Sequence, residues 1–323
     1  MVLYISKVKP QLPETRLGFL LEQLASCKIC PRNCGVDRLN GKIGVCGSGP
    51  GFEISSICIH TGEEPAIIGN NGICNVFFSH CNLSCIYCQN YQISSKPVEK
   101  SGQLTQFYEA IHSITRILDS GCKSVGFVSP THFIPHVKAI IETLRLQGYN
   151  PIFVYNTNGF DSVEEIRLLE NYINVYLPDY KYSDNNLARK LSKVSDYKQT
   201  ALLAIKEMYR QKGSTLITNE DGYAENGLII RHLVLPGYIE NSLVALREIA
   251  DISTSIAVSL MAQYFPTPAV KYHDSLNRTL LPEEYETVKN ELEKLGFYKG
   301  WVQELESNEN YRPDFELGKP FMD

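Results

Sequence analysis

From about residue 74 onward, short apolar runs alternate with amphipathic segments, and this alternation limits the possible folds more than any other feature of the sequence. Between the runs, apolar residues such as Val137, Ile140 and Leu144 repeat with the spacing of a helix face. Because strands that alternate with helices form parallel sheets, the sequence predicts an α/β fold, a (β/α)6 barrel or partial barrel. A doubly wound open sheet is the alternative. The predicted strands cover residues 75–79, 124–129, 152–156, 175–179, 229–235 and 257–263.

The two ends of the chain differ from this middle part. The first 70 residues are irregular and contain a group of cysteines, and the residues after Trp301 are mostly polar. We therefore expect a cysteine-containing N-terminal extension at 1–70, the barrel at 71–300 and a C-terminal tail at 301–323.

Charge and hydropathy argue against some roles. The net charge of −5 argues against general nucleic-acid binding, which needs a basic face to neutralise phosphates. The sequence has no apolar run of about 18 residues, so we expect no membrane span. Its first residues lack the apolar stretch of a signal peptide, and we expect a cytoplasmic protein.

Seven of the ten cysteines fall into two tight groups, and clustered cysteines in a reducing compartment favour metal binding over disulfides. Cys81, Cys85 and Cys88 have the pattern C-x3-C-x2-C and follow the first predicted strand. Three thiolates on one loop suit a [4Fe–4S] cluster with one iron left open, whereas electron-transfer clusters take four cysteines. A zinc site completed by a distant residue is the alternative.

The cysteine loop resembles that of the radical S-adenosylmethionine (SAM) superfamily, in which the open iron binds the amino and carboxylate groups of SAM. The family pattern has an aromatic residue before the third cysteine, here Tyr87, which lies beside the adenine. Residues 62–65, 77–79, 88–90 and 30–38 are similar to the PflX-like relatives of pyruvate formate-lyase activating enzymes. The resemblance implies a radical SAM barrel and cleavage of SAM to a 5′-deoxyadenosyl radical.

The resemblance also implies cofactor contacts after the second predicted strand. Activating enzymes carry Gly-Gly-Glu-Pro there, facing the SAM amino group, whereas this chain has Ser-Pro-Thr-His at 129–132. We expect Ser129, Thr131 and His132 to substitute for that motif, and an ordinary loop histidine is the alternative for His132. Residues 62–65, Gly-Glu-Glu-Pro, look like the motif but precede the cysteine loop, so no role is transferred to them.

Later loops carry further expected contacts. Asn158 lies in a Thr-Asn-Gly turn like that of activating enzymes, although Asn-Gly is also a generic turn. Asp179 and Lys181 match an Asp-x-Lys stretch whose lysine approaches the SAM carboxylate, and a solvated pair is the alternative. Arg231 resembles the start of the stretch that passes the ribose, and an arginine in an apolar strand needs a partner. Gln263, at the end of the sixth predicted strand, lines the cofactor pocket or simply packs.

Cys27, Cys30, Cys34 and Cys46 form a second group near the N-terminus. Four soft ligands suit either zinc or a second [4Fe–4S] cluster. Zinc would hold together a segment that lacks its own core, whereas a cluster could relay electrons or bind substrate. Free or redox-active thiols are the remaining alternative.

Three functions follow from these features. An activating enzyme would abstract hydrogen from a backbone glycine of a partner protein and so make a glycyl-radical enzyme. The missing Gly-Gly-Glu-Pro slightly favours the second function, a radical SAM enzyme that acts on a small molecule or another macromolecule. The third is a non-catalytic metal-binding or electron-transfer protein. The resemblance implies reduced flavodoxin or ferredoxin as electron donor for either enzyme.

Overall fold

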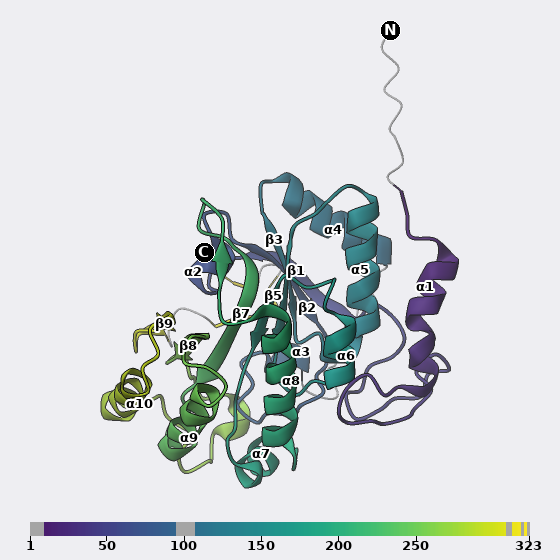
Figure 1. Cartoon of the computed structure of the whole chain (residues 1–323). Helices are drawn as coiled ribbons and strands as arrows, with labels where there is room; N and C mark the ends of the chain where they lie inside the picture. Colours follow the sequence, from purple (N-terminus) through teal and green to yellow (C-terminus); the bar gives the residue numbers. More distant parts are fainter. Residues whose placement is uncertain (1–9, 95–106, 308–311, 318–319, 322–323) are drawn as a thin grey trace.

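The computed structural model describes residues 10–94, 107–307, 312–317 and 320–321. Within these ranges the strands form one sheet in the order β1-β2-β3-β4-β5-β7-β8-β9, and the short β6 pairs with β7 (Figure 1). The strands are β1 (Ile54–His60), β2 (Ile73–Phe78), β3 (Ser124–Val128), β4 (Ile152–Thr157), β5 (Val175–Pro178), β6 (Ile217–Thr218), β7 (Ala224–Leu233), β8 (Ala257–Met261) and β9 (Gly300–Val302).

Neighbouring strands from β2 to β9 along this order are parallel, and β1 runs antiparallel to β2. The six predicted strands correspond to β2, β3, β4, β5, β7 and β8, so the α/β fold with a largely parallel sheet is confirmed. Their order in the sheet follows their order in the chain, which excludes the doubly wound alternative. In the described ranges the sheet ends at β1 and β9, as a partial barrel does.

Helices connect the strands and cover the outer face of the sheet (Figure 1), as successive right-handed crossovers require. None of the helices in the described ranges has the length and apolarity that crossing a membrane requires. The helices are α1 (Glu14–Leu21), α2 (Pro65–Ile68), α3 (Tyr91–Ser94), α4 (Phe107–Asp119), α5 (Ile134–Leu146), α6 (Val163–Leu168), α7 (Asn185–Ser192), α8 (Tyr197–Lys212), α9 (Ile239–Ala250) and α10 (Pro282–Lys294), with short 3-10 helices at Glu22–Ser26, Thr131–Phe133 and Pro268–Val270.

The main apolar core lies between the sheet and these helices. Val137, Ile140 and Leu144 of α5 are fully buried, which confirms the helix face that their spacing predicts. Helix α1 packs on α5, and Leu20 and Leu24 of the N-terminal region belong to the same core. Part of the cysteine-containing N-terminal region is therefore docked on the barrel.

Polar residues on several strands point away from this core into the interior of the barrel. Arg231 on β7 and Ser259 on β8 are partners in the strand register, and the Asp179 that follows β5 forms a bridge with Arg231. Asn75 on β2 and Asn156 on β4 are buried on the same inner side, where both amides bind one carboxylate. The sheet thus surrounds an interior that is polar around these residues, and a second apolar cluster that includes Ile73, Val154 and Ile229 lies beside it.

Candidate active site

A cavity of about 460 Å³ lies inside the barrel and has two chemically different ends. Cys81, Cys85 and Cys88 line one end, which we call the cysteine end, and they follow Phe78, the last residue of β2. The loop after β1, with Glu63 and Glu64, lines the other, which we call the acidic end. That loop follows His60, which pairs with Ile73, the first residue of β2.

At the cysteine end, each thiol has a polar hydrogen-bond partner. The amide nitrogen of Leu83 donates to Cys81 at 3.4 Å, and the Asn158 side chain donates to the same sulfur at 3.4 Å. The hydroxyl of Ser192 donates to Cys85 at 2.9 Å. The hydroxyl of Ser94 lies 3.1 Å from the sulfur of Cys88. Donors of this kind stabilise negative charge on sulfur and tune iron–sulfur clusters.

The cysteine end therefore fits a cluster that needs thiolate ligands. Burial raises the pKa of Cys81 to about 12 and raises the pKa of Cys88, and a positively charged metal centre would favour the thiolate form of both. Within the described ranges, no three His, Cys, Asp or Glu side chains already gather around one metal ion. A cubane binds each cysteine at a different iron, so its ligands do not need to converge on a single point.

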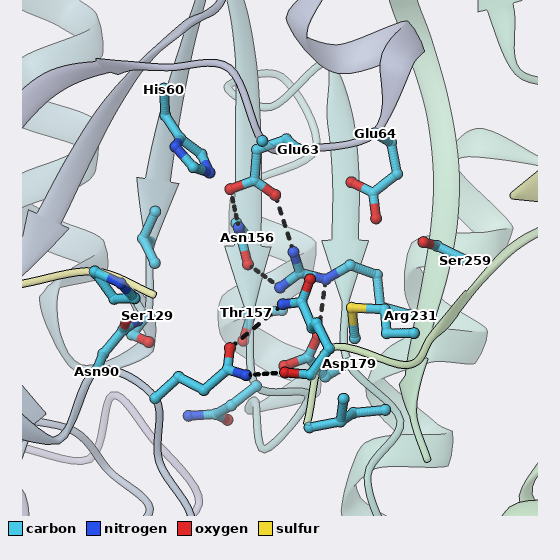
Figure 2. Close-up of a pocket in the computed structure, with 18 of the residues that line it drawn as sticks. His60, Glu63, Glu64, Asn90, Ser129, Asn156, Thr157, Asp179, Arg231 and Ser259 are labelled. Carbon is cyan, nitrogen blue, oxygen red and sulfur yellow. Dashed lines mark hydrogen bonds and ion pairs between the residues drawn. The ribbon is translucent and has the colours of Figure 1, made fainter. Parts of the chain in front are cut away.

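A buried network of charges crosses the middle of the cavity (Figure 2). The guanidinium of Arg231 contacts Glu63 at 3.0 Å and Asp179 at 2.8 Å, and it donates to the Asn156 oxygen at 2.6 Å. The ammonium of Lys181 contacts Asp179 at 2.6 Å. Arg231 thus has the partner that an arginine within an apolar strand requires.

Electrostatics keep this network charged. Burial alone opposes the ionisation of Asp179, but Arg231 and Lys181 together hold its pKa below the usual range. Lys181 is also buried, and Asp179 and Cys85 raise its pKa. Lys181 therefore remains a cation on the side of the cavity that faces the cysteines.

The acidic end contains polar atoms that the protein leaves without a partner. In the described ranges, Oε2 of Glu64 and Nδ1 of His60 are buried and have no hydrogen-bond partner. The two side chains are 7% and 8% exposed. Burial raises the pKa of Glu64 and lowers that of His60, because the protein stabilises the charged form of each group less well than water does.

Most residues that the sequence analysis assigns to the cofactor line this cavity. Besides the cysteines, they are Tyr87, Ser129, Asn158, Asp179, Lys181, Arg231 and Gln263. The hydroxyl of Tyr87 donates to Tyr182 at 2.6 Å, and the Gln263 side chain bonds with Gln89 and Gln303. The strand ends that carry these residues converge at one edge of the sheet, as parallel strands require.

Thr131 and His132 do not line the cavity, which corrects their expected placement. The Thr131 hydroxyl is buried and donates to Asp161 at 2.7 Å. The His132 ring lies 3.0 Å from the carbonyl oxygen of Ser79 and packs on Phe133. Ser129 has a left-handed backbone, with φ of 52°, and the chain turns there into the following helix. Because the chain turns away at Ser129, the side chains of Thr131 and His132 are buried outside the cavity.

The acidic end is the part of the site that is not predicted from the sequence. Residues 62–65 resemble a cofactor motif but precede the cysteine loop, and no site role is expected for them. The structure brings them inward because the unpredicted β1 pairs with β2 and ends beside the start of that strand. Charged Glu63 and Glu64 directly before Pro65, after a run of apolar and small residues, are the available signal.

The four N-terminal cysteines lie near one another in the structure. Burial raises the pKa of Cys30 to about 12, and the nearby thiols of Cys46, Cys27 and Cys34 add to this shift. The amide nitrogen of Val45 donates to Cys34 at 3.3 Å. The other three thiols are thus neighbours of Cys30, although no preformed metal geometry exists in the described ranges.

Comparison with known proteins identifies relatives of similar sequence and structure. An uncharacterized protein of Methanocaldococcus jannaschii is 28% identical over 293 residues, which cover 89% of this chain and 80% of that protein. SuiB of Streptococcus suis bound to S-adenosylmethionine gives a TM-score of 0.44 at 14% identity, over 71% of this chain and 50% of SuiB. This chain thus spans about half the length of SuiB.

Two other solved structures are also similar. A mutant of spore photoproduct lyase gives a TM-score of 0.49 at 10% identity, over 77% of this chain and 79% of the lyase. A domain of pyruvate-formate lyase-activating enzyme from Bacteroides vulgatus gives a TM-score of 0.37 at 15% identity, over 53% of this chain and 93% of the domain.

A family model gives the decisive match. The model described as the radical SAM superfamily matches residues 75–248, more than half of the 323 residues. The matched range contains the cysteine loop and the residues from Asp179 to Arg231 that cross the cavity. This chain therefore belongs to the radical SAM superfamily.

Proposed function

We propose that this radical SAM enzyme removes a hydrogen atom from a small polar molecule inside the barrel, in preference to the backbone glycine of a partner protein. The observation that supports this choice is the charged lining of the cavity: Glu63, Glu64, Asp179, Lys181 and Arg231. A glycine segment has no charge to offer to such a lining, whereas small polar molecules do. The volume of the cavity also lies in the range of small-molecule sites, roughly 300–1,000 Å³.

The family supplies the chemistry of the first step. Radical SAM enzymes bind a [4Fe–4S] cluster and SAM, and they need a reductant. When bound, the cluster and SAM would supply a 5′-deoxyadenosyl radical, by one-electron cleavage of SAM with release of methionine, and this radical would take the hydrogen atom of the substrate and end as 5′-deoxyadenosine. For this chain, reduced flavodoxin or ferredoxin is the proposed electron donor.

Cys81, Cys85 and Cys88 are the proposed ligands of the cluster. Their shared loop, their position at one end of the cavity and their hydrogen-bond partners support this assignment. Lys181 is the proposed partner of the SAM carboxylate, because it is a buried cation within electrostatic range of Cys85 and Cys88.

Other residues around the cofactor have proposed contact or positioning roles. Tyr87 is the proposed neighbour of the adenine, since it is buried and directly precedes Cys88. Ser129, Asn158 and Gln263 are proposed as polar contacts of the cofactor, because each lines the cavity. Asp179 and Arg231 are proposed as positioning residues between the two ends of the cavity, because they already form an ion pair with each other.

Activation of a glycyl-radical protein is the second candidate function. Four residues support it, because their motifs resemble those of activating enzymes and they all line one cavity: Asn158, Asp179, Lys181 and Arg231. The proposed place of this chain in the PflX-like branch rests on residues 30–38, 62–65, 77–79 and 88–90.

A second metal site is proposed at Cys27, Cys30, Cys34 and Cys46. The proximity of the other three thiols to Cys30 supports it, and both zinc and a second [4Fe–4S] cluster suit such ligands. Counting iron and zinc in the anaerobically purified protein distinguishes the two metals. About four irons with one zinc per chain favour zinc, and about eight irons favour a second cluster.

Transfer of deuterium into 5′-deoxyadenosine tests the proposed function. An extract of cells grown in deuterated medium is separated into a small-molecule fraction and a macromolecular fraction, and each is added to reduced enzyme with unlabelled SAM. Mass spectrometry of 5′-deoxyadenosine then reports which fraction gave the hydrogen atom. Label from the small-molecule fraction supports the proposal. Label from the macromolecular fraction alone contradicts it and supports the second candidate.

A further inference from the structure

The charges that line the cavity do not balance. Three carboxylates, Glu63, Glu64 and Asp179, face two cations, Arg231 and Lys181. The observed ion pairs connect Glu63 to Arg231, Arg231 to Asp179, and Asp179 to Lys181. Glu64 takes part in none of these pairs, so one carboxylate lacks a matching cation among the described residues that line the cavity.

Glu64 is also short of hydrogen bonds. Its side chain is more than nine-tenths buried, and in the described ranges Oε2 has no hydrogen-bond partner. Figure 2 shows the carboxyl between Glu63 and Ser259, directed toward the cavity. The buried Nδ1 of His60, on the same side of the cavity, lacks a partner as well. Ser259 supplies a side-chain hydrogen bond to the Glu64 carboxyl, but a buried carboxylate oxygen that lacks a partner is still costly, which indicates that a ligand completes this end.

We propose that Glu64 binds a positively charged amino group of the substrate at the acidic end of the cavity. The inference rests on the proposed function, because it assumes a small molecule inside the barrel. A protonated amine supplies the two things that Glu64 lacks, a matching positive charge and N–H donors for its free oxygen. A metal ion is a poorer match, since no three His, Cys, Asp or Glu side chains in the described ranges are arranged to hold one.

The position of Glu64 favours the substrate over SAM as the source of the amine. The loop that carries it begins beside Ile73, and the cysteines follow Phe78 at the opposite end of β2. The two ends of β2, five residue steps apart, are separated by roughly 17 Å. Arg231 and Glu63 are the charged neighbours of Glu64, whereas Lys181 is the charged neighbour of Cys88.

Three matched probes test the chemistry without knowledge of the natural substrate. Butylammonium, butanol and butyrate have the same chain length but carry a positive, a neutral and a negative end group. Binding of each probe to the anaerobic, cluster-loaded protein with SAM is measured by ligand-observed NMR titration. We expect butylammonium to bind at least roughly tenfold more tightly than the other two, because only it forms a charge-assisted hydrogen bond with Glu64.

Variants connect this preference to Glu64. Glu64→Gln keeps the shape of the side chain but removes its charge, and we expect it to abolish the preference for butylammonium. Glu165→Gln is the matched control, because Glu165 is 9% exposed, against 7% for Glu64, and also has an unpartnered Oε2 in the described ranges but lies outside the cavity lining. Circular dichroism checks that each variant folds. Glu64→Asp, which keeps the charge, replaces Glu64→Gln if that variant does not fold, and it should still prefer butylammonium to butyrate.

Three results would overturn the inference. They are equal binding of all three probes by the unmodified protein, an unchanged preference in Glu64→Gln, and a loss of SAM affinity in Glu64→Gln with butylammonium binding intact. The last result would assign Glu64 to the cofactor. Formation of 5′-deoxyadenosine by the unmodified protein is followed separately, so failure of the proposed function is distinguished from failure of the amine site.

Discussion

Replacement of Arg231 by methionine tests whether the network across the cavity is a structural requirement of the barrel. The guanidinium contacts Glu63 at 3.0 Å, Asp179 at 2.8 Å and the oxygen of Asn156 at 2.6 Å. Methionine keeps much of the volume but leaves two carboxylates with Lys181 as their remaining cation. It also leaves the Asn156 oxygen without its donor.

The expected cost follows from the burial of these groups. Side-chain exposures of 14% for Arg231, 11% for Glu63 and 13% for Asp179 leave little room for screening by solvent. Removing one partner of a buried ion pair costs about 3–5 kcal/mol, because the remaining charge stays buried. We expect the free energy of unfolding of Arg231→Met, measured by urea titration under anaerobic conditions, to fall by about this amount.

The cost should also depend on pH. In the unmodified protein the pKa of Asp179 is lowered, so its contribution to stability is complete above the unfolded pKa and is lost as the pH falls through the folded pKa. Without Arg231, the pKa of Asp179 rises, and protonation removes a buried charge. The difference in unfolding free energy between variant and unmodified protein should therefore be largest near neutral pH and shrink as the pH falls.

Arg210 provides the control, because it also contacts two carboxylates, Glu170 and Glu207, but its own side chain is 54% exposed. Glu207 is 6% exposed, but it keeps Arg167 and Gln211 as partners when Arg210 is removed. We therefore expect the free energy of unfolding of Arg210→Met to stay close to that of the unmodified protein. Equal unfolding midpoints for Arg231→Met and Arg210→Met would refute the reasoning about burial.

Three further predictions concern the turn, the cluster and the N-terminal cysteines. Gly159→Ala should lower the free energy of unfolding, measured by urea titration, by about 3 kcal/mol or more, because φ is +82° and a Cβ would collide with the carbonyl oxygen of Asp179. Gly148→Ala is the control: φ is +83° there, but the space around a Cβ is open, so the loss should be only about 1 kcal/mol. Ser192→Ala should lower the reduction potential of the cluster in an EPR-monitored titration, because it removes the hydroxyl that donates to Cys85; an unchanged potential would argue against Cys85 as a ligand. Cys30→Ala should leave the EPR spectrum of the radical cluster intact if the two metal sites are independent, and loss of that spectrum would show that they are linked.

Features with a local signal could be predicted from the sequence. The six strands that carry the barrel follow from apolar runs, and the face of α5 follows from the spacing of Val137, Ile140 and Leu144. The cysteine loop after β2 follows from spacing alone. The family match places the chain among enzymes, which sets aside the non-catalytic alternative. β6 and β9 have two and three residues, too few for a periodic pattern.

Contacts between distant segments could not be predicted in the same way. Glu63 and Arg231 are 168 residues apart in the sequence, and their ion pair depends on the antiparallel β1. The direction of a side chain also cannot be predicted from the sequence when a single backbone angle determines it. Thr131 and His132 follow the correct strand, but the left-handed Ser129 turns the chain so that both become buried elsewhere.

Formation of 5′-deoxyadenosine tests the central claim most directly. The protein is loaded anaerobically with iron and sulfide, reduced in the presence of SAM, and analysed for 5′-deoxyadenosine and methionine, with Cys85→Ala treated in parallel. We expect the unmodified protein to form both products in equal amounts and Cys85→Ala to form neither. Absence of 5′-deoxyadenosine from unmodified protein with an intact, reduced cluster, or undiminished formation by Cys85→Ala, would contradict the account.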